Sequence, residues 1–119
     1  MFNLFKRKDP TQHIDADGLR QRIATGEKLT ILDVRETSEY NEAHIDGSKL
    51  IPLNQLSMRM QDIPRDRPIV AVCRSGNRSS VACDMLRRAG YENVLNLDGG
   101  LFAWHRSGYP LKMKARKTG

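Results

Sequence analysis

Cysteine is scarce in this chain of 119 residues, which has only Cys73 and Cys83. Two thiols without paired Cys-x-x-Cys motifs are too few for a disulfide scaffold and lack the spacing of a zinc site. Long apolar runs are missing as well, so the sequence predicts no membrane-spanning helix. At the amino terminus the apolar residues precede the charges, the reverse of a secretory signal. We therefore expect a cytoplasmic protein with reduced thiols and no metal.

Aromatic residues make up only 6% of the chain, and its net charge of +6 is unevenly placed. Residues 9–111 hold 13 Lys and Arg against 14 Asp and Glu, so the excess positive charge belongs to the two ends. Nucleic-acid binding would favour basic residues along a folded face, interleaved with aromatic ones, so we expect no nucleic-acid partner. We predict one domain at 11–111 between solvated basic tails at 1–10 and 112–119.

The basic tails leave two alternatives open. They could contact an acidic partner, or the apolar side chains ahead of the first charges could form a weak anchor at a membrane surface. These side chains are Phe2, Leu4 and Phe5. We expect no membrane association as the main interpretation.

Apolar, β-branched runs alternate with helical patterns along the chain. The run at 69–72 is apolar without alternation, which indicates a parallel strand covered on both faces. Strands that alternate with helices predict an α/β layered fold with right-handed crossovers. We predict strands at 29–34, 50–53, 69–72 and 94–97, and helices at 17–25, 54–61, 77–89 and 101–107.

The strongest helical pattern is at 77–89, directly after the run at 69–72. Val81, Met85 and Ala89 form one i, i+4 row, with Ala82 and Leu86 beside it, and Gly90 supplies a left-handed cap. Cys73 is the first residue after the preceding strand, at the edge of a parallel sheet where ligands bind. The helix that holds the buried row thus begins beside a cysteine.

The segment between Cys73 and this helix has the features of an anion cradle. Gly76 permits a close backbone approach, and the N–H groups of the helix start can converge on one point. Lowering the pKa of a thiol raises its thiolate fraction but weakens its nucleophilicity, so acidification alone gives little. We expect prearranged N–H donors to contribute more to the reactivity of the cysteine than acidification does. Arg74 and Arg78 flank the cradle and are predicted to bind the anionic end of a substrate.

Several segments together resemble rhodanese-homology domains. Cys-Arg-Ser-Gly-Asn-Arg-Ser at 73–79 is similar to the active-site loop of that family, and Asp-Val-Arg at 33–35 with the segment 39–48 is similar to its first signature. The carboxyl-terminal signature is matched by Gly90-Tyr91, Asp98-Gly99-Gly100, Trp104 and Gly108-Tyr109-Pro110. Ala43 and Ser48 depart from the family pattern, which commonly has Gly and Ala there. The resemblance covers residues 12–111.

The resemblance implies a three-layer α/β fold with a central, mostly parallel, five-stranded sheet flanked by helices. It implies a thiosulfate sulfurtransferase without a cofactor, in which Cys73 takes a sulfur from a small donor, thiosulfate or a persulfide, and passes it to cyanide or a thiol. Cys73 is then the catalytic residue. The implied substrate-binding residues are the rest of the loop, namely Arg74, Ser75, Gly76, Asn77, Arg78 and Ser79.

Other residues receive supporting or structural interpretations. Asp33 and Arg35 end a strand near the loop and are predicted to brace it as a charge pair. His44 is not expected to be a base, because a thiolate needs none. Cys83 is interpreted as a buried core thiol and Trp104 as a packing anchor. Asp98-Gly99-Gly100 could lie beside the loop, but it is also an ordinary turn.

Two other functions remain open. A cysteine-dependent phosphatase or arsenate reductase would use five residues between its Cys and Arg, whereas four separate Cys73 from Arg78. The shorter loop predicts a cradle for a sulfur atom that would be cramped for phosphate. A non-catalytic interaction module on the same fold is the other alternative, and the complete loop with its cysteine argues against it.

Overall fold

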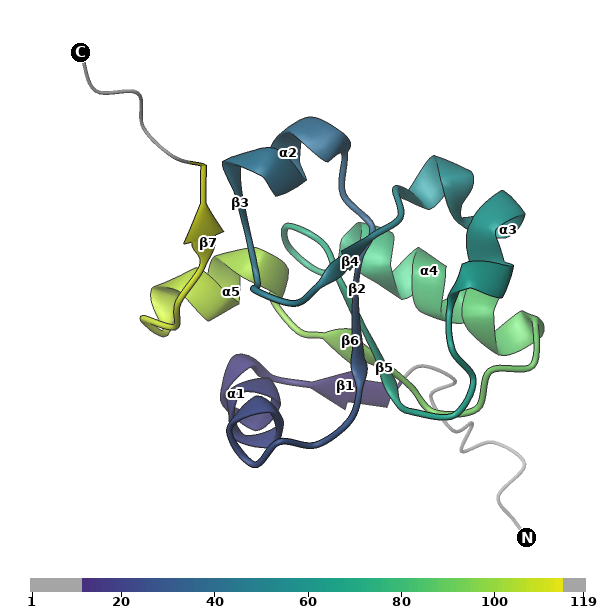
Figure 1. Cartoon of the computed structure of the whole chain (residues 1–119), viewed down its shortest axis with the longest axis horizontal. Helices are drawn as coiled ribbons and strands as arrows, with labels where there is room; N and C mark the ends of the chain where they lie inside the picture. The colour runs from purple at the N-terminus through teal and green to yellow at the C-terminus, as the bar shows by residue number, and fades with distance from the viewer. Residues whose placement is uncertain (1–11, 115–119) are drawn as a thin grey trace, which may run out of the picture.

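The computed structural model describes residues 12–114, and across these residues the central sheet has five parallel strands. Their order is β1-β6-β5-β2-β4, so the third strand along the sheet, β5, has neighbours on both sides (Figure 1). A small antiparallel pair, β3 with β7, lies apart from it. The strands are β1 Gln12–Ile14, β2 Thr30–Asp33, β3 Ala43–His44, β4 Lys49–Leu50, β5 Ile69–Val72, β6 Val94–Leu97 and β7 Lys112–Met113.

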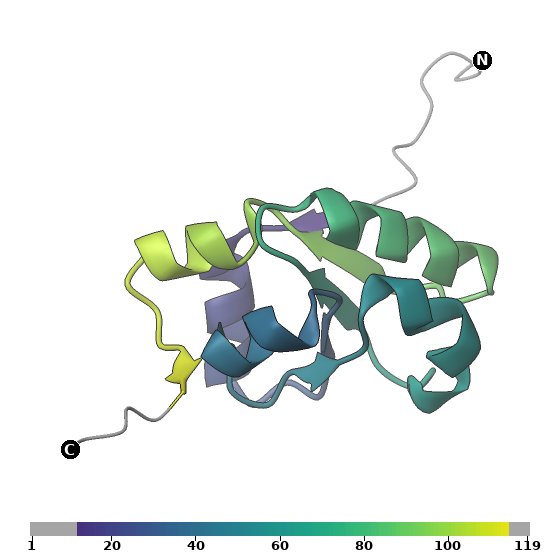
Figure 2. The ribbon, with the colours of Figure 1, turned by 90° about the horizontal axis from the view of Figure 1, so that it is seen from above.

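Helices connect the strands and cover both faces of the sheet. They are α1 Ala16–Ala24, α2 Thr37–Glu42, α3 Leu56–Arg59, α4 Asn77–Arg88 and α5 Gly100–Arg106, with 3-10 turns η1 Leu53–Gln55 and η2 Met60–Asp62 on either side of α3. Figures 1 and 2 show α1 and α5 on one face and α3 and α4 on the other. This arrangement is the three-layer α/β fold with a parallel five-stranded sheet that the resemblance implies.

Alternating side chains of the central strands divide the core into two clusters. Val70 and Val72 pack toward α1 and α5, where Leu19 and Trp104 are buried. Ile69 and Ala71 pack with the residues of α3 and α4. A strand buried on both faces must be apolar throughout, which explains why β5 reads as an unbroken apolar run.

The strands predicted at 69–72 and 94–97 are confirmed, and the helices predicted at 17–25, 77–89 and 101–107 each lie within one residue of their observed bounds. The segment predicted at 54–61 is helical throughout, but only residues 56–59 are α-helical, and the 3-10 turns η1 and η2 make up the rest. Leu56 is buried, and Leu53 and Met60 in the flanking turns pack against the same core cluster. The strand predicted at 50–53 is reduced to β4. The Ile51 and Leu53 N–H groups still donate to the Asp33 and Val34 carbonyls, but the chain turns into η1 at Leu53.

The buried face of α4 includes the predicted Ala82 and Leu86 but is turned away from Val81. Val81 is 51% exposed, whereas Ala82, Cys83 and Leu86 are completely buried. Ser79, in the first turn, is also buried. Of the row that starts at Val81, Val81 and Ala89 are exposed, whereas Met85 packs against the core. Ser79 belongs to the buried face, but a polar residue does not contribute to hydrophobic periodicity, so the sequence pattern did not indicate its burial.

The carboxyl-terminal end of the domain extends past the predicted boundary at 111. Lys112 pairs with His44 and Met113 with Ala43, and the Lys114 N–H donates to the Glu42 carbonyl. The first residues of the segment predicted as a basic tail thus belong to a strand. The rest of that segment and the whole predicted tail at 1–10 lie outside the described residues. No helix in the region 12–114 is long and apolar enough to cross a membrane.

Candidate functional site

The candidate site lies where β2, β5 and β6 end together at one edge of the sheet. Asp33 is in register with Val72, and Ala71 with Asn96, so the residues that follow these strands meet at that edge. Cys73 directly follows β5 and leads into the loop that ends at α4. The topology alone therefore places the cysteine where parallel α/β proteins bind ligands.

The sulfur of Cys73 accepts hydrogen bonds from its own loop. The Gly76 N–H donates to Sγ at 3.0 Å, and the Ser79 hydroxyl lies 3.3 Å from it. Gly76 has a φ of 113°, a left-handed conformation that turns its N–H back toward the sulfur. Ser75 and Asn77 are exposed on the outside of the loop. The structure thus brings Gly76 and Ser79 to the sulfur, as the sequence analysis expected of the loop.

Two opposing effects act on the pKa of the Cys73 thiol. Burial raises it, because a buried thiolate loses its hydration. Hydrogen bonds from the Ser79 hydroxyl and from nearby backbone N–H groups lower it by more, so the pKa falls below its ordinary value. The N–H groups belong to Ser79, Gly76 and Ser75. The site favours the thiolate through donors that are already in place.

The carbonyl groups of the loop are held on its outer side by the start of α5. The Leu101 N–H donates to the Cys73 carbonyl at 2.8 Å and the Phe102 N–H to the Arg74 carbonyl at 3.1 Å. Gly100 makes this contact possible, because a Cβ there would stand 2.4 Å from the Cys73 carbonyl oxygen. With its carbonyls bound outside, the loop can direct N–H groups inward. Asp98-Gly99-Gly100 therefore lies beside the loop.

The two arginines of the loop have different surroundings. Arg78 donates to both carboxylate oxygens of Glu39 from α2, at 2.7 and 3.0 Å. This ion pair lowers the pKa of Glu39 to about 2. Arg74 is exposed and lines a cleft of about 410 Å³ between α5 and the α2–β3 segment. The apolar wall of that cleft includes Leu101, Phe102, Leu111 and Met113.

Asp33 and Arg35 form a buried ion pair at the end of β2. The Arg35 guanidinium donates to Asp33 at 2.9 and 2.8 Å and to the Ala43 carbonyl at 2.7 Å. The pair therefore ties the end of β2 to β3. His44 donates from Nδ1 to the Tyr40 carbonyl, 2.8 Å away, and its ring stacks on the Tyr40 ring. These contacts are those of a structural residue rather than of a catalytic base.

Cys83 and Trp104 lie in the core. Both are at most 1% exposed. Trp104 donates from Nε1 to the Pro110 carbonyl at 2.9 Å and packs edge-on against Tyr109. The structure places both as the sequence analysis expected, as a buried thiol and a packing anchor.

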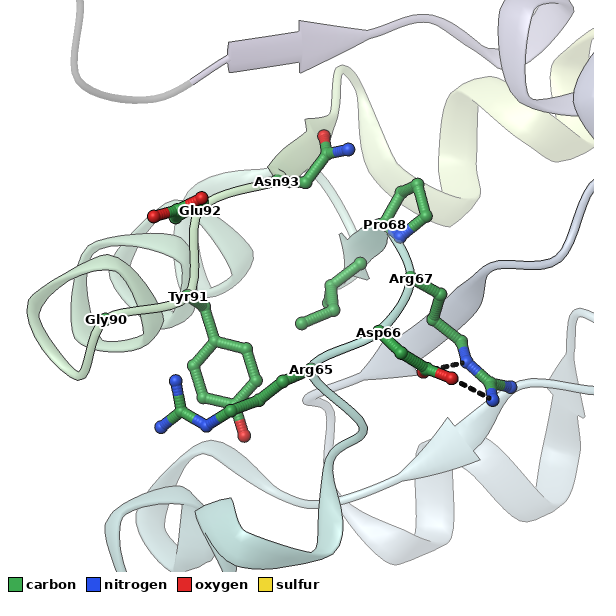
Figure 3. A pocket seen from close by; sticks show the side chains of 9 residues that line it. Arg65, Asp66, Arg67, Pro68, Gly90, Tyr91, Glu92 and Asn93 are labelled. Carbon is green, nitrogen blue, oxygen red and sulfur yellow. Dashed lines mark hydrogen bonds and ion pairs between the residues drawn. The ribbon is translucent and has the colours of Figure 1, made fainter.

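A second cavity, of about 360 Å³, lies at the opposite edge of the sheet, where β5 and β6 begin (Figure 3). Arg65 lies over the Tyr91 ring at 4.0 Å and donates to the Ala89 carbonyl, while Asp66 pairs with Arg67. Asp66 and Arg67 are bound to each other, Arg65 is held by a carbonyl and a ring, and the cavity lies at the other end of β5 from Cys73. We therefore assign the chemistry to the Cys73 edge.

Sequence reasoning assigned no site role to Glu39 or Asn96, and it placed Gly100 beside the loop only as an alternative to an ordinary turn. Asn96 donates to the Gly76 carbonyl at 3.1 Å and accepts from the Ser79 hydroxyl at 2.5 Å. A usable signal existed for Asn96, since it is the one polar residue in the run Val-Leu-Asn-Leu at 94–97. No local pattern pairs Glu39 with Arg78, because they lie 39 positions apart in the sequence.

Comparison with known proteins gives a consistent result. The family model of the rhodanese-like domain matches residues 15–107. A sulfurtransferase of Allochromatium vinosum is 42% identical over 98 residues, which cover 82% of this chain and 92% of that protein. The thiosulfate sulfurtransferase GlpE of Shewanella oneidensis is 32% identical, over 81% of this chain and 94% of its own length. The rhodanese-like domain of the Anabaena protein Alr3790 has a TM-score of 0.80 at 34% identity, over 94% and 86% of the two chains.

Proposed function

Since the chain belongs to the rhodanese-like domain family, we propose that it is a sulfurtransferase that carries sulfur on Cys73 as a persulfide. The observation that carries the proposal is the hydrogen-bonded sulfur of Cys73, which accepts from Gly76 and Ser79 inside a loop whose outer carbonyls are bound elsewhere. Such fixed donors stabilise negative charge on sulfur before and after transfer.

The proposed reaction has two displacements. The Cys73 thiolate attacks the outer sulfur of thiosulfate, the S–S bond of the donor breaks, and sulfite leaves with the bonding electron pair. Cyanide or a thiolate then attacks the outer sulfur of the persulfide, and the Cys73 thiolate leaves. Each step returns one sulfur anion to the loop, so the same donors serve both steps.

Arg74 is the proposed contact for the anionic end of the donor. Its side chain is exposed at the cleft beside the loop, and guanidinium groups bind oxyanions in a bidentate manner. Arg78 was predicted for the same role, but Glu39 occupies its guanidinium in this structure. We propose that Arg78 acts mainly by anchoring the loop to α2.

The phosphatase alternative has less support. It needs an arginine that faces the oxyanion across the loop, and the Arg78 guanidinium faces Glu39 instead. A non-catalytic module would not need a cysteine with a lowered pKa in a cradle of donors. Both observations favour sulfur transfer.

Intact-mass measurement after incubation with thiosulfate tests the proposal. We expect one added sulfur atom per chain, which cyanide removes as thiocyanate, and no adduct on the Cys73→Ala variant. An adduct that persists in that variant would overturn the assignment, as would no adduct at all. Turnover of p-nitrophenyl phosphate would favour the phosphatase instead.

A further inference from the structure

Asn96 is a polar residue in a strand that is otherwise apolar and buried. It is 5% exposed, and the other residues of β6 are Val94, Leu95 and Leu97. A buried amide is unfavourable unless its donor and acceptor both have partners. The partners of Asn96 therefore indicate what the residue is for.

Both partners of the Asn96 amide belong to the Cys73 loop and the helix that follows it. The Nδ2 group donates to the Gly76 carbonyl at 3.1 Å, and Oδ1 accepts from the Ser79 hydroxyl at 2.5 Å. Turning the amide over would place Oδ1 against the Gly76 carbonyl, two acceptors facing each other, so the orientation is fixed by its partners.

The Ser79 hydroxyl has one proton and two acceptors within reach. Oδ1 of Asn96 is 2.5 Å away and the Cys73 sulfur 3.3 Å away. While Cys73 is a thiol, its S–H can donate to the Ser79 oxygen, and Ser79 can donate to Asn96. A thiolate has no proton and only accepts. The Ser79 proton must then turn to the sulfur, and Oδ1 loses its partner.

We propose that Asn96 is a positioning residue that holds the Ser79 proton away from Cys73 while Cys73 is a thiol, and so opposes its ionisation. Asn96 thereby limits how far the loop acidifies the cysteine and keeps the sulfur a stronger nucleophile. The inference rests on the proposed function only in taking this sulfur as the reacting atom.

Other charged and titratable groups surround Cys73 and stay in place when Asn96 is changed. Those on α4 are Arg78, whose charge interacts with Cys73, and the neighbouring thiol Cys83. Elsewhere they are Arg74 in the loop, the Asp33–Arg35 pair at the end of β2, Glu39 on α2 and Asp98 after β6. The loop also keeps a support, because the Gly76 carbonyl accepts from the Ser80 N–H at 3.2 Å.

The test is the pH dependence of Cys73 alkylation by iodoacetamide, followed by intact mass. Asn96→Ala and Asn96→Leu both free the Ser79 proton, and Leu does so without opening a cavity. Either variant should lower the midpoint by about one pH unit, which raises the thiolate fraction about tenfold at pH 6. Because the more acidic thiolate is a weaker nucleophile, we expect alkylation at pH 6 to be about threefold faster than in the wild type. Asn96→Asp keeps the acceptor and adds negative charge, so its midpoint should move upward.

A second set of variants separates this role from a structural one. In a Ser79→Ala background the proton is absent, so Asn96→Leu should leave the midpoint unchanged. Asn93→Ala, at an exposed position before β6, is the matched control and should behave as the wild type. An unchanged or raised midpoint in both Asn96→Ala and Asn96→Leu would overturn the proposal, as would an equal shift without Ser79. Alkylation needs no sulfur donor, so this failure is distinct from failure to form a persulfide.

Discussion

Cys73 and Cys83 lie in the same apolar cluster, and each is at most 1% exposed. The pKa values of their thiols are nevertheless shifted in opposite directions. Burial raises the pKa of Cys83 to about 12, with only a partial offset from Arg87, whereas the donors around Cys73 lower its pKa despite burial. The difference lies in the backbone, because Cys83 is inside α4, where its neighbours' N–H groups are bound within the helix. Burial makes a thiol inert unless the backbone supplies free donors to it.

The largest expected effect comes from replacing the sulfur of Cys73 with oxygen, and the same replacement at Cys83 is the comparison. Cys73→Ser should lower thiocyanate production from thiosulfate and cyanide by about a thousandfold or more, because the hydroxyl cannot hold a transferable sulfur. Cys83→Ser should keep the turnover number within about threefold, since its thiol contacts no reacting group. Steady-state assays of the two purified variants give the comparison directly. Equal losses would remove the distinction between the two cysteines.

Gly100 tests whether the loop depends on α5. Gly100→Ala places a Cβ 2.4 Å from the Cys73 carbonyl oxygen. The clash and the unfavourable backbone conformation should together lower the free energy of unfolding by about 3–5 kcal/mol. Gly108→Ala is the control, because Gly108 also has a positive φ but no atom within 4 Å of the added Cβ.

Urea unfolding measures both glycine variants. Gly108→Ala should cost about 1 kcal/mol from its backbone conformation alone. A Gly100→Ala variant with the stability of Gly108→Ala would show that the close approach of α5 to the loop is not tight.

The raised pKa of Cys83 predicts a loss of stability at alkaline pH. The unfolded thiol ionises near its ordinary pKa, but the folded one stays protonated up to about 12. Stability from this group is therefore full below the ordinary pKa and declines as the pH rises toward 12, by about 3 kcal/mol at pH 11. Cys83→Ala should remove that part of the decline. Urea unfolding of both proteins from pH 8 to 11 measures it, and parallel pH profiles would contradict it.

The smallest expected effect concerns the Glu39–Arg78 ion pair, which fixes the start of α4. The pKa of Glu39 is lowered to about 2, so its stabilisation is full above the ordinary carboxyl pKa of 4.5 and is lost as the pH falls through about 2. The pair is partly exposed, so Glu39→Gln should cost only about 1 kcal/mol at pH 7. The difference from the wild type should shrink between pH 5 and pH 2. A difference that is constant with pH would argue against the ion pair.

The sequence predicted the fold well where hydrophobic patterning is strong. The runs at 69–72 and 94–97 became β5 and β6 with the same bounds, because strands buried on both faces must be apolar. It failed where structure depends on distant pairing. The two-residue strands β3 and β7 stabilise each other across the chain, and neither has a local pattern.

The candidate site shows the same division. The contacts of Gly76 and Ser79 with the sulfur are local and could be expected from a loop that precedes a helix. The supports of that loop come from Glu39, Asn96 and Gly100, which lie on other elements. Their roles follow from topology, which brings the ends of β5 and β6 together. The sequence indicates this through the polar Asn96 in an apolar strand and the Gly99-Gly100 turn that follows.

The most direct test of the account is to locate the sulfur on the chain. Trypsin cleaves after Arg74 and Arg78, so Cys73 and Cys83 fall on different peptides. After treatment with thiosulfate and capping of free thiols at neutral pH, mass spectrometry should find one added sulfur on the Cys73 peptide and none on the Cys83 peptide, with cyanide removing it. A sulfur on Cys83, or none on either peptide, would contradict the claim that the donors around Cys73 select it as the sulfur carrier.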